Sequence, residues 1–187
     1  MTDLRNVQDK YKGWLTELIR DDIQRIKYPY SVLMQQLEYD FNIGAVIRNA
    51  DIFGAKQVFY YGDRKHFDNR GCVGANHYNY ISHLKTADQL EKLHETSLFV
   101  ALETSPAAVD IRDFNWPVNC TMLIGEEKDG LSPELMSMAD HVVRIPMFGA
   151  VRSLNAASAS AVAMFSYIQQ HGRDHASISN SELLSTS

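Results

Sequence analysis

The feature that most constrains this chain of 187 residues is an alternation of short apolar runs with helical patterns, which begins near Tyr30. Parallel strands need crossover connections, and these are usually helices, so the alternation predicts a parallel sheet with helices on both faces. We therefore expect a three-layer α/β domain. The predicted strands cover residues 31–37, 57–61, 80–84, 98–102, 120–125 and 141–145, and the predicted helices cover residues 43–53, 87–96, 133–139 and 154–170.

Length and pattern together predict one domain with a short appendage at each end, because a domain takes about 150 residues. We assign residues 1–29 to a helical N-terminal extension, 30–171 to the main domain and 172–187 to a mobile polar tail. The extension carries apolar residues at spacings of three and four, with Asp3 as its cap and Tyr28-Pro29 as its stop. Two interpretations stay open: the extension packs on its own domain, or it binds a partner subunit or RNA.

Composition excludes several classes of protein. With 45% hydrophobic and 22% charged residues, the chain is typical of a soluble globular protein. The 18 basic and 23 acidic residues give a net charge of −5, which excludes bulk attraction to nucleic acid but not a local basic patch. Only Cys72 and Cys120 are present, which favours a reducing compartment. No apolar run approaches the ~20 residues of a membrane span and no signal peptide is seen, so we expect a cytoplasmic protein.

Several common functional motifs are missing. The sequence has no dinucleotide-binding or triphosphate-binding glycine motif, and no nucleophile elbow of the α/β-hydrolases. It has no close cluster of His, Cys and carboxylate residues, so we expect no metal site. Ligands of α/β sheets bind at the carboxyl ends of strands. The loops after Tyr61, Leu102, Ile124 and Ile145 are therefore the predicted place for chemistry.

Three segments contain residues that suggest more than a structural role. The first is Asn42-Ile-Gly-Ala-Val-Ile-Arg-Asn-Ala-Asp-Ile-Phe-Gly54. Asn42 suits the N-cap of a helix, and Gly54 suits its end. Arg48 interrupts an otherwise apolar helix, so its guanidinium must meet an anion or extend into solvent. It forms a structural ion pair with Asp51 or Glu126, or it has a functional role.

Two further segments combine loop residues with chemically active side chains. Residues 123–134 place Glu126 directly after a buried strand, and Ser132-Pro133 then opens a helix. Residues 145–163 run from a strand through a Pro/Gly loop into a helix with Ser153 and Asn155 in its first turn. A helix N-terminus presents unpaired N–H groups to a ligand.

In this order and spacing, the three segments resemble the signature motifs of the SpoU/TrmH family of RNA 2′-O-ribose methyltransferases, in the SPOUT superfamily. The resemblance covers about residues 31–170, and it departs at Ala156 and Ala157, where the family often has Val-Ser, and in the region 62–81. It implies a three-layer parallel-sheet SPOUT fold with a C-terminal deep trefoil knot. General connection rules would instead give an unknotted sheet.

The resemblance also implies an S-adenosylmethionine cofactor and an RNA substrate, tRNA or rRNA, bound by a homodimer. The residue matching Arg48 is the family's proposed general base. Because arginine stays protonated in proteins, we favour Arg48 as a fixed cation that stabilises the developing alkoxide and binds the neighbouring phosphate. The implied catalytic residues are Asn42, Arg48, Glu126, Ser153 and Asn155.

Binding residues follow from the same resemblance. The cofactor would lie between the loop after the fourth strand, the strand end at residue 125 and the loop 145–154, on Glu103, Thr104, Gly125, Ile145, Met147, Ser153 and Leu154. The basic residues that could meet RNA phosphate are Lys12, Arg25, Arg64, Lys65, Arg70 and Arg152.

Two other functions stay open at the level of sequence. One is a non-catalytic RNA-binding or assembly protein that retains the SPOUT fold, although the presence of all five implied catalytic residues disfavours it. The other is a SPOUT enzyme that methylates a base nitrogen or a protein, which the Asn/Arg pattern of the first segment disfavours.

Overall fold

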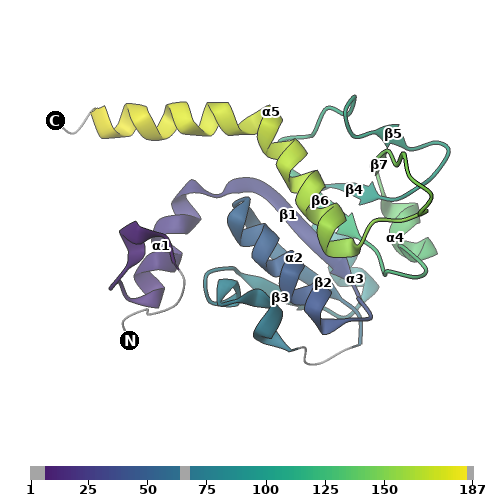
Figure 1. The fold of residues 1–187 in the computed structure, drawn as a ribbon, viewed down its shortest axis with the longest axis horizontal. Coiled ribbons are helices and arrows are strands. Elements are labelled where there is room, and N and C mark those ends of the chain that lie inside the picture. Colours follow the sequence, from purple (N-terminus) through teal and green to yellow (C-terminus); the bar gives the residue numbers. More distant parts are fainter. Residues whose placement is uncertain (1–6, 64–67, 185–187) are drawn as a thin grey trace.

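The computed structural model describes residues 7–63 and 68–184 (Figure 1). Its helices and strands follow the predicted alternation closely. In chain order they are η1 (Asp9–Tyr11), α1 (Thr16–Ile26), β1 (Tyr28–Gln35), α2 (Asp40–Ile52), β2 (Ala55–Tyr61), η2 (Asn69–Cys72), η3 (Ala75–His77), β3 (Ile81–Leu84), α3 (Ala87–His94), β4 (Leu98–Leu102), β5 (Val109–Asp110), β6 (Cys120–Ile124), α4 (Pro133–Met138), β7 (His141–Arg144) and α5 (Ala156–Leu184).

The strands form one seven-stranded sheet in the order β3-β2-β1-β6-β4-β7-β5, and every neighbouring pair is parallel. This confirms the predicted parallel α/β sheet. β1 lies inside it between β2 and β6. The sequence missed β5, because a strand of two residues is too short to show an alternating pattern.

Helices cover both faces of the sheet, as predicted. Successive side chains of a strand point to opposite faces, and in β1 Val32 packs with α2 and α5 while Leu33 packs with α3 and α4. Figure 1 shows α2 and α5 together in front of the central strands. The strands are buried on both sides, which fixes the positions of the loops at their carboxyl ends.

The N-terminal segment differs from the single helix that its pattern predicts. Gly13 adopts a left-handed φ of +85° and separates η1 from α1. A left-handed residue cannot continue a right-handed helix, so the helix restarts at Thr16. Tyr11 and Ile19 then pack on Tyr78 of the main domain, and the predicted cap, Asp3, lies outside the described residues.

The last helix is longer than predicted. α5 begins at Ala156 and continues past Gly172 to Leu184, where the sequence predicts a polar tail. Its first part packs on α2, and its last part extends beyond the sheet (Figure 1). Across the described residues, no helix is both long and apolar enough to cross a membrane.

We predict that Gly44→Ala lowers the free energy of unfolding by about 1–3 kcal/mol, because overpacking forces backbones apart. A Cβ at Gly44 would lie 2.6 Å from the Cα of Gly71, so α2 and η2 would have to separate. Urea unfolding measures the change. Gly149→Ala is the control, because a Cβ there meets no atom within 4 Å. Equal stability of the two variants would contradict this account of the contact.

Candidate functional site

A cavity of about 430 Å³ opens at the carboxyl ends of β4, β6 and β7. Its walls are the residues just after β4, the turn after β6 and the loop between β7 and α5. Three of the four loops predicted from strand ends therefore meet here, and the loop after Tyr61 is not part of the lining. The volume lies within the ~300–1,000 Å³ range of small-molecule sites.

The lining of this cavity includes all seven residues that the family resemblance assigns to a cofactor. It also includes Glu126 and Arg152, whereas Asn42, Arg48 and Asn155 are outside the lining. The seven residues are Glu103, Thr104, Gly125, Ile145, Met147, Ser153 and Leu154.

A tight turn after β6 forms one wall of the cavity. The N–H of Glu126 donates to the carbonyl of Gly130 at 2.9 Å, and the N–H of Gly130 donates back at 3.1 Å. A Cβ on Gly125 would overlap the backbone of Gly130 and Leu131, so only glycine fits there. Gly130 has a φ of +71°, which favours glycine as well.

Glu103 holds this turn from β4. Its carboxylate accepts hydrogen bonds from the N–H of Leu131 at 3.2 Å and from the N–H of Thr104 at 3.0 Å. The backbone of Glu103 donates to the carbonyl of Val143 on β7. Glu103 thereby ties the end of β4 to the turn after β6 and to strand β7.

Asn42 connects the three motif segments. Its side-chain Nδ2 donates to Glu127, and its Oδ1 accepts from Nδ2 of Asn155 at 3.1 Å. Glu127 also accepts from the N–H of Glu38 at 3.0 Å. The prediction that Asn42 caps its helix is wrong, because α2 begins at Asp40 and the Asn42 amide is buried in this network instead.

Ser132 has the capping role that the sequence predicts, whereas the prediction that Ser153 and Asn155 lie in the first turn of a helix is wrong, because α5 begins at Ala156. Oδ1 of Asn155 accepts from the N–H groups of Ala157 at 3.0 Å and Ser158 at 3.3 Å, so Asn155 caps α5. Oγ of Ser132 accepts from the N–H of Leu135 at 3.3 Å, and Pro133 occupies the first turn of α4. The start of α5 is thus tied both to its own cap and to α2.

Sequence reasoning missed two residues of this network, Glu127 and Gln35. Gln35 ends β1, donates from Nε2 to Glu126 at 3.4 Å, and accepts from the N–H of Ser132 at 2.7 Å. Its place at the last position of a central strand was the available signal. Glu127 adjoins Glu126, and nothing in the sequence distinguishes which of the two acids faces Asn42.

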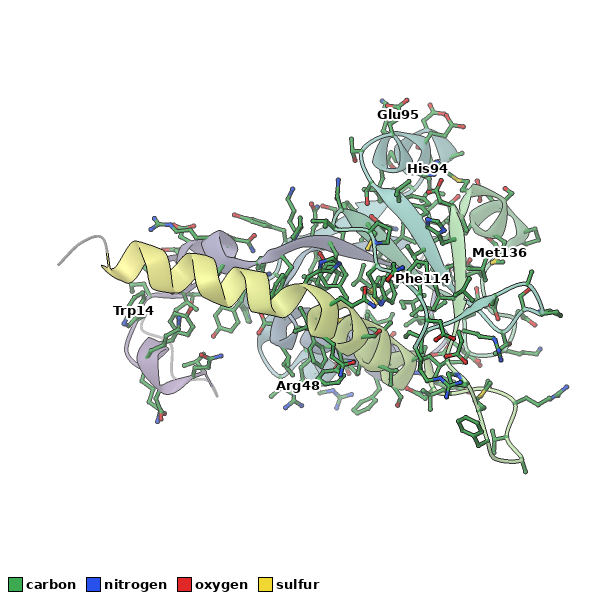
Figure 2. All side chains as sticks on the ribbon, turned by 90° about the horizontal axis from the view of Figure 1, so that it is seen from above. Trp14, Arg48, His94, Glu95, Phe114 and Met136 are labelled. Carbon is green, nitrogen blue, oxygen red and sulfur yellow. The ribbon has the colours of Figure 1, made fainter. Side chains whose placement is uncertain are left out.

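Arg48 lies outside the cavity of its own chain. It is exposed, and it follows Asn42 by six residues, which at about 100° per residue turns it about 120° away around the helix. Asn49, which shares the Asn42 side of α2, donates instead to the carbonyl of Ala157 at 2.8 Å. Arg48 lies at the outer edge of the molecule, beside α5 (Figure 2). Within residues 7–63 and 68–184 it forms no ion pair, so the pairing with Asp51 or Glu126 is absent there.

Arg48 lines a second cavity, of about 810 Å³, between the N-terminal segment, α2 and α5. At this cavity Nζ of Lys27 donates to Oδ1 of Asn79 at 2.6 Å, and Nδ2 of Asn79 donates to Asp51 at 3.3 Å. Burial lowers the pKa of Lys27 to about 8 and raises the pKa of Asp51, because it penalises both charged forms. These contacts attach the N-terminal segment to the helix that carries Arg48.

The basic residues predicted to meet RNA do not gather on one element. Lys12 pairs with Asp9 at 2.6 Å, and Arg70 pairs with Asp68. Arg25 is exposed on α1, and Arg152 lines the first cavity. Arg64 and Lys65 lie outside the described residues.

A model of the SpoU rRNA Methylase family matches residues 29–165. The chain belongs to this family. Curated relatives include the tRNA (guanosine(18)-2′-O)-methyltransferase of Escherichia coli strain K12, 31% identical over 139 residues, which are 72% of this chain and 61% of the relative. The Thermus thermophilus enzyme of the same name is 30% identical over 152 residues, which are 79% of this chain and 78% of that relative. The chain therefore spans less than two thirds of the Escherichia coli protein.

Solved structures of this family share the fold. The TrmH/SpoU tRNA modifying enzyme of A. aeolicus superposes with a TM-score of 0.74 at 22% identity, over 85% of both chains. The SpoU methyltransferase AviRb from Streptomyces viridochromogenes, solved in complex with AdoMet, gives 0.70 at 26% identity, over 80% of this chain and 61% of that one. Within the described part of the chain, no three His, Cys, Asp or Glu side chains are grouped so as to hold a metal ion.

We predict that Asn155→Ala lowers the free energy of unfolding by about 1 kcal/mol, because it removes the cap of α5. Asn155→Asp keeps the capping oxygen but loses the amide that donates to Asn42, and it places a second carboxylate near Glu127. Urea unfolding of both variants distinguishes the loss of the cap from the loss of the hydrogen bond to Asn42. Asn155→Asp should be less destabilised at pH 5 than at pH 8, because the repulsion between the two carboxylates weakens as the pH falls. An Asn155→Ala variant as stable as the parent would contradict the capping role.

Proposed function

We propose that this chain is an S-adenosylmethionine-dependent methyltransferase that modifies a ribose 2′-hydroxyl of tRNA or rRNA. The observation that carries the proposal is the cavity at the strand ends, because its lining includes every residue that the family pattern assigns to the cofactor. Membership of the SpoU rRNA methylase family supports the reaction class, and the 2′-O-methyltransferase relatives support ribose as the acceptor.

The chemistry of the cavity suits this cofactor. Leu102, Ile124, Val143 and Leu154 offer apolar contacts for an adenine ring, and backbone groups around Gly125 offer hydrogen bonds. The lining also holds Glu103, Glu126, Glu127 and Asp129, which favour a positive sulfonium. The absence of a phosphate-binding glycine loop from the sequence agrees with a cofactor that carries no phosphate.

We further propose that two copies of the chain form the active enzyme and that each cavity uses Arg48 of the other copy. Arg48 is exposed on α2 and lies outside the cavity of its own chain. Large apolar side chains are exposed on α2 and on α5. On α5, the ring of Phe165 packs against the ring of Phe53, with 6.4 Å between the ring centroids. An isologous pairing through these two helices would cover them and bring Arg48 to the partner. The exposed apolar residues are Phe41, Ile52, Val162 and Phe165.

In the mechanism, the residues of this chain position the acceptor and stabilise its charge. S-Adenosylmethionine supplies an electrophilic methyl group, which the ribose 2′-oxygen takes as the carbon–sulfur bond breaks. Arg48 is a fixed cation beside that oxygen and the adjacent phosphate, and the 2′-proton leaves to a phosphate oxygen or water. Asn42 and Glu127 hold Asn155 and the start of α5 in place, and Ser153 and Glu126 line the site. Positioning of this kind supplies much of the acceleration.

We propose in addition that the C-terminal segment is threaded as the trefoil knot of the SPOUT superfamily, and that the enzyme is cytoplasmic. The fold shared with SpoU methyltransferases supports the knot. The proposed tRNA or rRNA substrate supports a cytoplasmic location.

One observation favours a second candidate function, a non-catalytic RNA-binding or assembly protein. In the single chain, Arg48 does not line the cavity that would hold the cofactor. If no partner supplies the guanidinium, the cations that line the cavity are Lys128 and Arg152. Experiments on Arg48 therefore decide between the two functions.

We predict that Arg48→Ala reduces methyl transfer to RNA by at least 100-fold, because removal of one preorganised charge from an active site has effects of about 10²–10³. Transfer of radioactive methyl groups to total RNA from cells that lack this gene measures the rate, and mapping of 2′-O-methyl positions identifies the nucleotide. Lys92→Ala, an exposed charge on α3, is the control. Wild-type turnover in Arg48→Ala would remove the assignment.

Mixed dimers test whether Arg48 acts on the partner's cavity. Arg48→Ala and Thr104→Trp, which fills an exposed position of the cavity wall, are each expected to inactivate the homodimer. Co-expression with two affinity tags isolates the mixed dimer. A shared site leaves one cavity intact, so the mixed dimer should regain about half of the wild-type activity, as expected for one intact site of two in an isologous pair. An inactive mixed dimer would place Arg48 in the cavity of its own chain.

A further inference from the structure

The rim of the first cavity carries an exposed aromatic ring and arginines that none of the assigned roles uses. Phe148 follows the cavity residue Met147 in the loop after β7, and 87% of its surface is exposed. Arg112 lies over its ring, with Cζ 5.9 Å from the ring centroid. A cation placed within about 6 Å of an aromatic face is attracted to it. The loop therefore presents a ring of defined orientation beside the cavity.

The edge of the sheet fixes this arrangement. β5 lies beside β7 at the edge of the sheet (Figure 1), and in this pairing Asp110 is opposite Arg144. Arg112 binds the Asp110 carboxylate through Nε at 2.9 Å and Nη2 at 2.8 Å, and Nη2 of Arg144 is 3.9 Å from the same carboxylate. The hydrogen bonds from Arg112 lower the pKa of Asp110 to about 2, so the carboxylate stays ionised at ordinary pH. Two guanidinium groups share the Asp110 carboxylate, and Asp113 also lies close enough to Arg112 to interact with its charge.

The two sides of the cavity mouth differ in charge. The turn after β6 carries Glu126, Glu127 and Asp129 around a single Lys128. The loop after β7 instead contributes Arg152 to the lining. A polyanion that reaches the cavity would be repelled from the first side and attracted to the second.

We propose that Phe148 and Arg112, here called the rim platform, bind one unpaired nucleotide of the RNA substrate beside the nucleotide to be methylated. The base would stack on the ring of Phe148, and the backbone phosphate would contact Arg112 and Arg144. This inference rests on the proposed RNA methyltransferase function and deepens it, because it names the substrate as RNA that is single-stranded at the site.

Physical chemistry favours a nucleotide over other occupants of the platform. An aromatic ring with one open face stacks on any base, and base–aromatic stacking is the usual source of affinity for single strands. Bases inside a duplex are already stacked, so the platform selects unpaired nucleotides. A second copy of this chain would instead be drawn to the exposed apolar side chains of α2 and α5.

Fluorescence anisotropy of the full-length protein tests the platform without any need for turnover. The probes are a labelled single-stranded RNA oligonucleotide and the same strand in a duplex. Phe148→Ala and Phe148→Leu should weaken binding of the single strand roughly 5- to 100-fold, since stacking contributes that much per base, and Phe148→Trp should restore it. Log affinity falls as log salt concentration rises, and Arg112→Gln should make this slope less steep by about 1.

Variants of two other exposed residues serve as controls. Trp14→Ala removes an exposed ring on the N-terminal segment, and Lys92→Gln removes an exposed charge on α3; neither should change binding of the single strand. The platform is refuted if Phe148→Leu binds like the parent, if the parent prefers the duplex, or if the parent binds neither probe. It is also refuted if Phe148→Ala dissociates the dimer in analytical ultracentrifugation, which would make Phe148 an interface residue.

Kinetics separate failure of this inference from failure of the proposed function. With total RNA as substrate, Phe148→Ala should raise the KM for RNA, with kcat within twofold and the calorimetric affinity for S-adenosylmethionine unchanged. Turnover by the parent with an unchanged KM in Phe148→Ala refutes the platform alone. Absence of turnover in the parent refutes the proposed function, while the anisotropy result still decides the platform.

Discussion

The side-chain amide of Asn42 is the contact on which the arrangement of the site depends. It is buried, it donates to Glu127 in the turn after β6, and it accepts from Asn155 at the start of α5. A buried amide that lost either partner would carry an unsatisfied polar atom, which costs about 1–3 kcal/mol. The three segments are therefore coupled through one residue, although Glu127 and Asn155 follow Asn42 by 85 and 113 positions in the chain.

The fold was largely predictable from the sequence, because β-branched and apolar runs bounded by turn residues mark buried parallel strands clearly. β4 begins and ends at the predicted residues, and the other long strands differ by a few positions at their ends. The break at Gly13 was not predicted, since apolar spacing on either side of it continues the same helical period. Only the left-handed backbone of Gly13 interrupts the helix, and spacing contains no information about that conformation.

The sequence predicted residues that line the cavity, but not their contacts, and three of the five predicted catalytic residues lie outside the lining. The residues assigned to the cofactor through the motifs line one cavity, because the motifs lie at strand ends that a parallel sheet brings together. Which acid meets Asn42, and the role of Gln35, depend on side-chain directions in a five-residue turn. The direction of Arg48 follows from helix geometry relative to Asn42, but the interpretation of that direction needs a second copy of the chain.

The hydrogen bonds of Lys27 and Asn79 have a consequence for how the domain should be delimited. Asp51 sits one turn from Arg48 on α2, and its buried carboxylate relies on the Asn79 amide and on the nearby Lys27 amine. Residues 7–27 lie before the region matched by the family model, which starts at residue 29. A shortened chain that began at residue 29 would lack Lys27, which is the counter-charge of Asp51. It would also lack the N-terminal residues that line the second cavity beside α2. In this protein the N-terminal segment therefore supports α2, the helix that carries Arg48.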